Sequence, residues 1–266
     1  AGTVTLFARA GTIETSTDVE IVPGSASDPV LPLVGPRSIV ADGAHWTMVV
    51  TTPRDQYLNP VAENSLVSLR IQHPVKPAAE PASTLELAET RTQHLLSWKR
   101  IFSRTLAGES FLSASSGNAH SPERSFLEVP GIPVPFALSA DRMILPADGR
   151  QLVRIRSELI KDRYGNILLD GSSVLLLAQM KTGEQRSVPT QIIDGRMDLM
   201  LQAPKTVGEM TLQAWIAGIS SQPLVLNFTP GPAVEPIPVA VTITTEEVQL
   251  LIGPLVGDLN QFIPDG

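Results

Sequence analysis

Short runs of apolar and β-branched residues, separated by turn residues, recur along the whole chain. Within a run, apolar and polar positions alternate, so that Leu66, Leu69 and Ile71 are expected to face the core and Arg70 the solvent. The runs follow one another at roughly 8–12 residues, which is typical of a β-sandwich. No long stretch combines helix caps with a 3.6-residue period. The pattern predicts an all-β protein with strands over 46–52, 66–71, 152–156, 173–178, 211–216 and 224–228.

The sequence also repeats itself. A Gly-x-x-x-(apolar)-x-Ala motif begins at Gly2, Gly108 and Gly208, and a Pro-Gly pair follows each first glycine after 21 or 22 residues. An Ala-Asp-Gly triplet occurs twice, with Asp42 and Asp148 106 residues apart. Several motifs in the same order at the same spacing indicate tandem units of about 100 residues each.

A turn rich in Asp and Asn supplies a further repeated motif. It occurs at 55–64 and 162–171, and a shortened version closes the sequence at 258–266. A Pro-rich stretch at 231–238 is typical of a stiff connector. We therefore predict the end of a preceding repeat over 1–30, complete sandwiches over 31–131 and 132–231, and a linker with the start of a further repeat over 232–266.

The segment 94–102 fits two local structures. Its apolar residues at 95, 98, 101 and 102 suit one face of a helix. The repeat instead aligns it with 196–201, where apolar residues alternate as in a strand. Because the repeat constrains the whole unit, we predict a strand. The Pro-rich stretch 74–81 before it lengthens this unit, and insertions of this kind lie on loops.

These motifs resemble those of the bacterial immunoglobulin-like repeats of the invasin and intimin type. The turn at 162–171 matches the family pattern best, whereas the turn at 55–64 has Leu58 in place of the expected glycine. The resemblance covers essentially the whole chain. It implies tandem immunoglobulin-like β-sandwiches in a bacterial surface, periplasmic or secreted protein, and it implies no catalytic activity.

Composition narrows the classes of function. The chain has 266 residues, no cysteine and a formal net charge of -7. The absence of cysteine excludes a disulfide framework, a thiolate zinc site and a cysteine nucleophile. The acidic balance argues against nucleic acid as a partner. No apolar run approaches the ~18 residues of a membrane-spanning helix.

The sequence gives no basis for assigning a catalytic residue or a cofactor. Nucleophile-elbow, zinc-protease and phosphate-loop motifs are all missing. The four histidines, His45, His73, His94 and His120, are scattered over one unit, and we expect them on the surface or half-buried. We predict no enzyme activity.

Two sets of side chains are candidate binding residues. We predict no metal site; the candidate calcium ligands, should there be one, are Asp42, Asp55, Asp148 and Asp162 of the acidic turns, because calcium favours clustered carboxylates. The competing interpretation is a set of turns in which each carboxylate accepts backbone N–H groups.

The other set is a basic segment without Asp or Glu, with aromatic residues between its charges. Its candidate contact residues are Arg91, Trp98, Lys99, Arg100 and Arg104. The competing interpretation is a strand whose apolar side faces the core and whose basic side is solvated.

Three functions are compatible with these features. The first is a structural and adhesive stalk that spaces a binding tip at the bacterial surface, with a protein or glycan partner. The second is a structural subunit of a larger envelope assembly, in which the partial units pair with neighbouring subunits. The third is a carbohydrate-binding module, which is disfavoured because two or three residues are expected to be buried among Trp46, Trp98, Trp215, Tyr57 and Tyr164.

Overall fold

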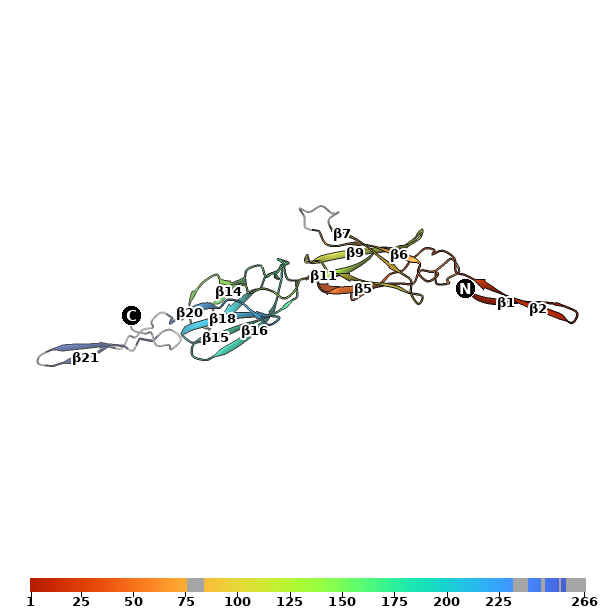
Figure 1. Ribbon diagram of the computed structural model, residues 1–266. Coiled ribbons are helices and arrows are strands. Elements are labelled where there is room, and N and C mark those ends of the chain that lie inside the picture. The colour runs from red at the N-terminus through yellow and green to blue at the C-terminus, as the bar shows by residue number, and fades with distance from the viewer. Residues whose placement is uncertain (76–83, 232–238, 245–246, 254, 257–266) are drawn as a thin grey trace. The chain divides into compact units, whose positions relative to one another are not determined.

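The computed structural model describes residues 1–75, 84–231, 239–244, 247–253 and 255–256 (Figure 1). The chain divides into two compact units, unit 1 (Ala1–Gly131) and unit 2 (Ile132–Gly266). The described part contains no α-helix, and so none that is long and apolar enough to cross a membrane. Most of the Pro-rich insertion, the connector after residue 231 and the final Asp/Asn turn lie outside the described residues.

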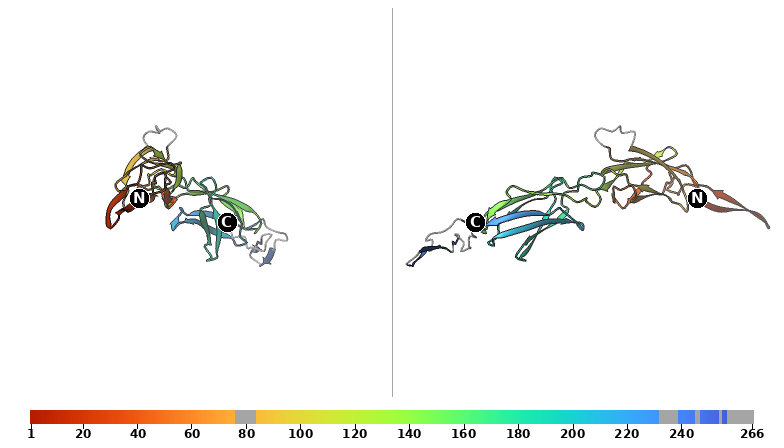
Figure 2. Two further views of the ribbon diagram at one scale, coloured as in Figure 1. Left: turned by 90° about the vertical axis from the view of Figure 1, so that its right-hand side faces the viewer. Right: turned by 60° about the vertical axis from the view of Figure 1, so that its left-hand side comes forward.

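Unit 1 contains a β-sandwich (Figures 1 and 2). Its strands are β3 (Leu33–Gly35), β4 (Ser38–Val40), β5 (Trp46–Thr51), β6 (Leu66–Gln72), β7 (Leu85–Arg91), β8 (Ser97–Phe102), β9 (Gly108–Ser116), β10 (Ala119–His120) and β11 (Arg124–Val129). One sheet has the order β4-β11-β9-β6-β7, with β10 paired to β9, and the other has the order β3-β5-β8. The segment 97–102 is therefore a strand, as the repeat predicted.

Alternation along the strands builds the core of unit 1. On β6 the side chains of Val67, Leu69 and Ile71 are buried, which follows the two-residue period of a strand. The expectation that Leu66 faces the core is wrong, because it is out of phase with Leu69 and Ile71 and is 40% exposed. On the neighbouring strand β9, Leu112 and Ala114 lie on the same inner face, because they pair with Ile71 and Leu69, respectively.

Unit 2 repeats the same topology. Its strands are β12 (Leu138–Ala140), β13 (Ile144–Pro146), β14 (Leu152–Ser157), β15 (Ser173–Met180), β16 (Gln185–Gln191), β17 (Asp198–Gln202), β18 (Gly208–Ile216), β19 (Ile219–Ser220) and β20 (Leu224–Thr229). The sheets have the orders β13-β20-β18-β15-β16, with β19 paired to β18, and β12-β14-β17. Leu212 and Ala214 of β18 are fully buried and occupy the positions of Leu112 and Ala114. The repeated motifs thus fix which face of each strand lies inside.

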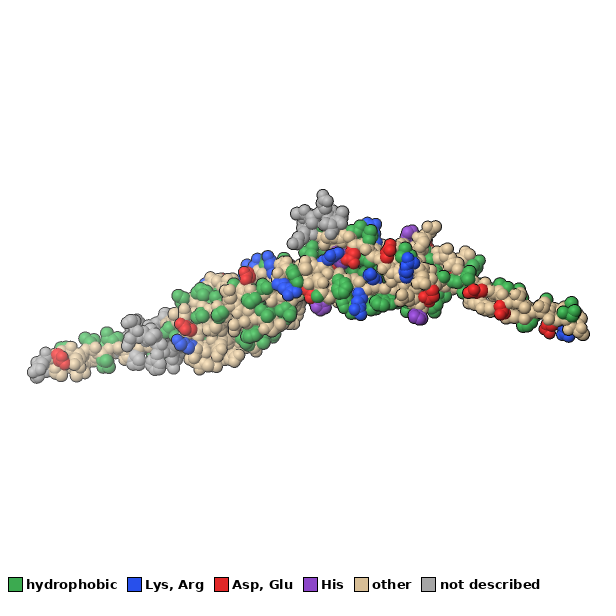
Figure 3. Space-filling model, viewed as in Figure 1, with side chains coloured by type: hydrophobic (Ala, Val, Ile, Leu, Met, Phe, Trp, Pro, Cys, Tyr) green, Lys and Arg blue, Asp and Glu red, His purple; other side chains and the backbone are tan. Residues whose placement is uncertain are grey.

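Each unit also carries a separate antiparallel hairpin. In unit 1 it consists of β1 (Gly2–Ala10) and β2 (Ile13–Ile21), and in unit 2 of β21 (Val239–Ile243) and β22 (Val248–Ile252). All residues of these four strands are exposed. β1 begins with the same Gly-x-x-x-Leu-x-Ala motif as β9 and β18, although its Leu6 is 53% exposed. Apolar side chains are visible along both hairpins (Figure 3).

Candidate contact face

The acidic turns of the sequence hold backbone corners. Oδ1 of Asp55 accepts hydrogen bonds from the backbone N–H groups of Tyr57 and Asn59, both at 2.9 Å, and Oδ2 accepts one from Gly24 at 3.0 Å. Asp162 accepts the same pair of bonds from the residues two and four positions after it. Burial raises the pKa of Asp55, but these hydrogen bonds outweigh burial and lower the pKa below its ordinary value.

The Ala-Asp-Gly triplets form a second kind of corner. Oδ1 of Asp42 accepts from the backbone N–H groups of Ala44 and His45, and Oδ2 lies 2.8 Å from His45 Nδ1. Burial raises the pKa of Asp42, but the hydrogen bonds from His45 and Ala44 outweigh it and lower the pKa to about 2. Asp148 accepts from the residues two and three positions after it, and these bonds also lower its pKa.

These bonds bear on the predicted calcium ligands. Each of the four carboxylates already accepts backbone N–H groups. Within the described ranges, no group of three or more His, Asp or Glu side chains is placed to hold a metal ion. The geometry favours the competing interpretation of hydrogen-bonded turns, and calcium binding at these residues stays the alternative hypothesis.

The histidines do not share one environment. His45, His94 and His120 are exposed, but His73 is 1% exposed, so the expectation of a surface or half-buried histidine is wrong there. Nδ1 of His73 lies 2.7 Å from Oε1 of Glu128. The buried Ser110 donates its hydroxyl to the same carboxylate oxygen and not to the imidazole. The arrangement therefore lacks the serine–imidazole contact of an activated nucleophile.

The predicted contact residues of the basic segment separate in the structure. Arg91 lies on β7 and donates to the backbone oxygen of Asn64, while Arg104 donates to the carboxylate of Glu86 at 3.0 Å. Lys99 pairs with the inward-facing Val49 and lies on the inner side of the edge strand β8. Trp98 and Arg100 alone among the five predicted residues share the outward side of β8.

This outward side is apolar and aromatic. Trp98, Arg100 and Phe102 of β8 pair with residues of β5, and Leu33 of β3 pairs with the same strand. Trp98 and Phe102 are each 50% exposed, and Leu33 is 72% exposed. The guanidinium carbon of Arg100 lies 4.6 Å from the centre of the Trp46 ring, which is a cation–π contact. We name as the aromatic face the outward side chains of Leu33, Trp46, Met48, Val50, Trp98, Arg100 and Phe102.

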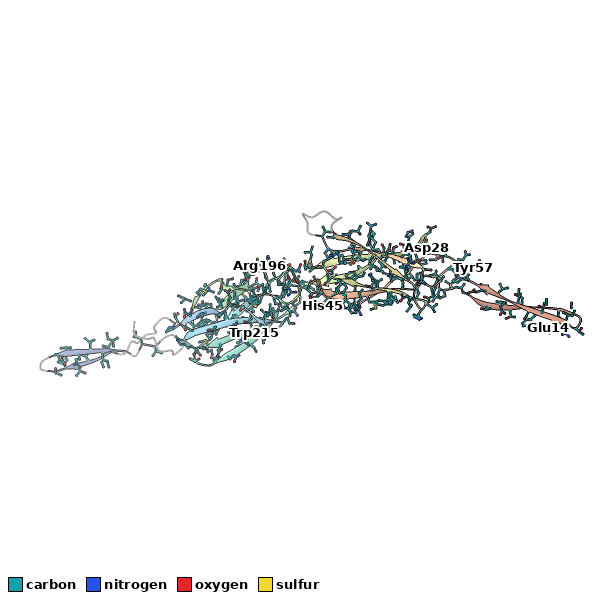
Figure 4. The ribbon with its side chains drawn as sticks, in the orientation of Figure 1. Glu14, Asp28, His45, Tyr57, Arg196 and Trp215 are labelled. Atoms are coloured by element: carbon teal, nitrogen blue, oxygen red, sulfur yellow. The ribbon has the colours of Figure 1, made fainter. Side chains whose placement is uncertain are left out.

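The aromatic face corrects two expectations. On β8 the residues that face the core are Ser97 and Ile101, so the competing interpretation, in which the apolar side of this strand lies inside, is wrong for Trp98 and Phe102. The expectation that two or three of the tryptophans and tyrosines are buried is also wrong. None of the five is fully buried: Trp46, Tyr57, Trp98, Tyr164 and Trp215. Figure 4 labels Tyr57 and Trp215.

The corresponding face of unit 2 is ion-paired. The positions of Met48, Val50 and Trp98 are occupied by Arg154, Arg156 and Asp198, respectively. Arg154 donates to both carboxylate oxygens of Asp198, at 2.8 and 2.6 Å, and Arg156 donates at 2.9 Å. The hydrogen bond from Arg154 lowers the pKa of Asp198 to about 2, against the effect of burial, and Arg156 adds to it.

Comparison with known proteins identifies the fold. No protein-family model and no curated protein sequence matches the chain. Among solved structures, InvD of Yersinia pseudotuberculosis is 18% identical with a TM-score of 0.56, over 88% of this chain and 72% of InvD. The Escherichia coli adhesin FdeC is 16% identical with a TM-score of 0.57, over 86% of this chain and 74% of FdeC.

The fold is that of bacterial immunoglobulin-like repeats. The similarity confirms the tandem β-sandwich architecture and the resemblance that the turn motifs predicted. At identities below 20% it shows the fold alone, so the role of the aromatic face has to be argued from its own chemistry.

Three members of the aromatic face, Leu33, Met48 and Val50, were assigned no contact role from the sequence. A signal for this face was present in the repeat. Trp98 aligns with Asp198, and a position that holds an aspartate in one unit is expected to face solvent in the other.

Proposed function

We propose that the chain is a non-enzymatic structural and adhesive part of a bacterial cell-surface or secreted protein. Its repeats space and present a contact surface, in an extracellular, cell-surface or periplasmic location. The observation that carries the proposal is the exposed aromatic face of unit 1, which lies on three strands of the sandwich. The equivalent face of unit 2 is occupied by ion pairs instead. The fold shared with InvD and with the adhesin FdeC supports it.

The proposed organisation follows the repeat. Residues 1–30 are the end of one repeat, 31–131 and 132–231 are complete repeats, and 232–266 are a linker with the start of another. Supporting observations are the equal topology of the two sandwiches and the glycine motif shared by β1, β9 and β18.

Adhesion of coated beads tests the proposal. Beads carrying the chain are applied to cultured epithelial cells under flow. The matched control is the triple variant Met48→Arg, Val50→Arg and Trp98→Asp, which installs the side chains of unit 2 on the same backbone positions. Adhesion by the parent chain that is lost in the triple variant, at unchanged thermal stability, is the expected result. If beads coated with the parent chain adhere no better than uncoated beads, the adhesive function is wrong.

A second candidate is a structural subunit of a larger envelope assembly. It is favoured by the exposed apolar side of the β1–β2 hairpin, where Val4 and Leu6 lie across from Val19 and Thr17. Such a surface is unusual on an isolated soluble protein. Mass measurement by analytical ultracentrifugation tests this candidate. A discrete oligomer that Leu6→Glu dissociates, while Ser16→Glu on the polar side does not, supports it, and a monomer at all concentrations contradicts it.

A further inference from the structure

We propose that the aromatic face of unit 1 binds a protein surface that presents a carboxylate among apolar side chains. The inference rests on the proposed adhesive function and names its partner class. Two properties of the face carry it: a cation that makes no ion pair with any described residue, and a composition that suits protein rather than carbohydrate.

The cation is Arg100. Among the described residues, its guanidinium makes no hydrogen bond or ion pair, and it is held over the Trp46 ring at 4.6 Å. No Asp or Glu occurs between Thr90 and Gly108, so β8 and its flanking turns supply no counter-charge. In unit 2 both arginines of the equivalent face are paired with Asp198. A carboxylate from a partner would complete in unit 1 the kind of pair that unit 2 makes internally.

Stacking on Trp46 prepares Arg100 for such a pair. A guanidinium held over an aromatic ring has already lost part of its side-chain freedom. Its edge still presents N–H donors for a bidentate bond to a carboxylate. The strands β5 and β8 fix both residues, so less conformational entropy is lost when a partner binds.

The remaining side chains favour a protein partner. Trp, Phe, Met and Arg are enriched at the centres of protein interfaces, and Trp and Arg dominate their binding energy. Trp98 and Phe102 are half-exposed on one strand, with Met48 and Val50 half-buried beside them on the next. An apolar partner surface would cover all four without leaving a buried polar group unpaired.

A carbohydrate fits this face less well. Sugar hydroxyls need hydrogen-bond partners around the ring that stacks, and burying them without such partners costs free energy. The face offers the guanidinium of Arg100 and two indole N–H groups, and it has no carboxylate, amide or hydroxyl side chain. A protein partner with one carboxylate matches this inventory.

Selection from a random-peptide phage library tests the proposal. The library is panned on the parent chain and counter-selected on the Met48→Arg, Val50→Arg, Trp98→Asp variant. Recovered peptides are synthesised and titrated by fluorescence anisotropy. We expect them to combine Asp or Glu with apolar residues. Replacing the acid by its amide, or Arg100 by the Met found at this position in unit 2, should weaken binding about ten-fold, as for one charge-assisted pair.

Controls separate the face from the rest of the chain. Arg124→Met, on β11 of the other sheet, should leave peptide affinity unchanged, and thermal unfolding checks that each variant is folded. Peptides without acids, or peptides that bind Arg100→Met as tightly as the parent, would overturn the proposal. The proposal would also be overturned if no peptide is recovered and the chain instead binds sialylated or uronate-rich glycans on an array, with binding that is lost in the triple variant.

The bead assay distinguishes this inference from the adhesive function. If the parent and the triple variant adhere equally, the aromatic face is not the contact surface, although the chain is adhesive. If peptides bind the face and the beads do not adhere, the partner class stands and the adhesive function is wrong.

Discussion

The imidazole Nδ1 of His73 lies 2.7 Å from Oε1 of Glu128, and both side chains are fully inaccessible to solvent inside unit 1. The other ring nitrogen lies 3.3 Å from a carboxylate oxygen of Glu86. Ser110 donates its hydroxyl to Glu128 at 2.6 Å, and the backbone N–H of Arg104 donates to the other carboxylate oxygen, so the buried carboxylate has three partners from other strands or loops. In the described part of the chain, no buried side-chain nitrogen or oxygen lacks a hydrogen-bond partner.

The cluster of His73, Ser110 and Glu128 can be compared with the equivalent positions of unit 2. At the positions of His73, Ser110 and Glu128, unit 2 has three buried apolar residues: Met180, Met210 and Phe228. The same backbone therefore accepts either a polar network or an apolar cluster at one end of its core. Removing a single partner from a buried network leaves the other groups unsatisfied, whereas replacing all of them together does not.

Glu128→Ala should destabilise unit 1 by about 3–5 kcal/mol, because it leaves His73 and Ser110 buried without their carboxylate. The concerted replacement of His73 and Ser110 by Met and of Glu128 by Phe leaves the backbone N–H of Arg104 as the group without its acceptor, so it should destabilise unit 1 by less than Glu128→Ala does. Urea unfolding followed by tryptophan fluorescence, in a Trp215→Phe background that leaves only the tryptophans of unit 1, measures both effects.

The matched control for this series is Glu109→Ala, an exposed glutamate on β9, which should change stability by no more than about 0.5 kcal/mol. A triple replacement as destabilising as Glu128→Ala would show that the polar network has a packing role which the apolar residues of unit 2 cannot supply.

Leu58 and Gly165 occupy the same place in the two Asp/Asn turns, and both have positive φ, 66° and 85°. Leu58→Gly should stabilise unit 1 by about 0.5–1 kcal/mol, since left-handed backbone costs a branched residue more than glycine loses in chain entropy. Leu58 is 72% exposed, so little buried area is lost.

Gly165→Ala should destabilise unit 2 by about 1 kcal/mol through its backbone alone, because its added Cβ would meet no neighbour within 4 Å. Thermal unfolding of both variants checks the pair, and equal signs would contradict this account.

The fold was predictable because the repeat and the strand period constrain each other. The alignment of Gly108 with Gly208 sets the phase of β9 and β18, and that phase places Leu112 and Leu212 inside. The same alignment decided between helix and strand for 97–102. Where we departed from a two-residue period, as at Leu66, the prediction failed.

The candidate site was less predictable because side-chain direction on an edge strand was inferred from hydrophobicity. The competing interpretation of the basic segment placed Trp98 and Phe102 inside, yet the strand period pairs them with outward positions of β5. The contact between His73 and Glu128 joins residues 55 positions apart and has no local pattern. The position of His73 can be recognised as part of the core only when the two units are aligned, because unit 2 has Met180 there.

Calcium is expected to leave the stability of both units unchanged. Both carboxylate oxygens of Asp55 accept N–H donors, from Tyr57 and Asn59 on one oxygen and Gly24 on the other, and a cation would have to displace these bonds. Differential scanning calorimetry in calcium and in a chelator measures the midpoint of unfolding. A midpoint that rises with calcium in the parent chain, and does not rise in Asp55→Asn, would instead assign a calcium site to this turn.

Acid should weaken unit 2 through Asp198. Its pKa is lowered to about 2 in the folded protein, mainly by the hydrogen bond from Arg154, whereas an unfolded aspartate has a pKa of about 3.9. The ionised carboxylate therefore contributes stability above pH ~4, and this contribution is lost as the pH falls from ~4 to ~2. Because Arg154 and Arg156 are about half exposed, it amounts to less than about 1 kcal/mol. In calorimetry, Asp198→Asn should be less stable than the parent at pH 6 and equal to it near pH 2, and a difference that persists at pH 2 would assign the effect of the substitution to packing.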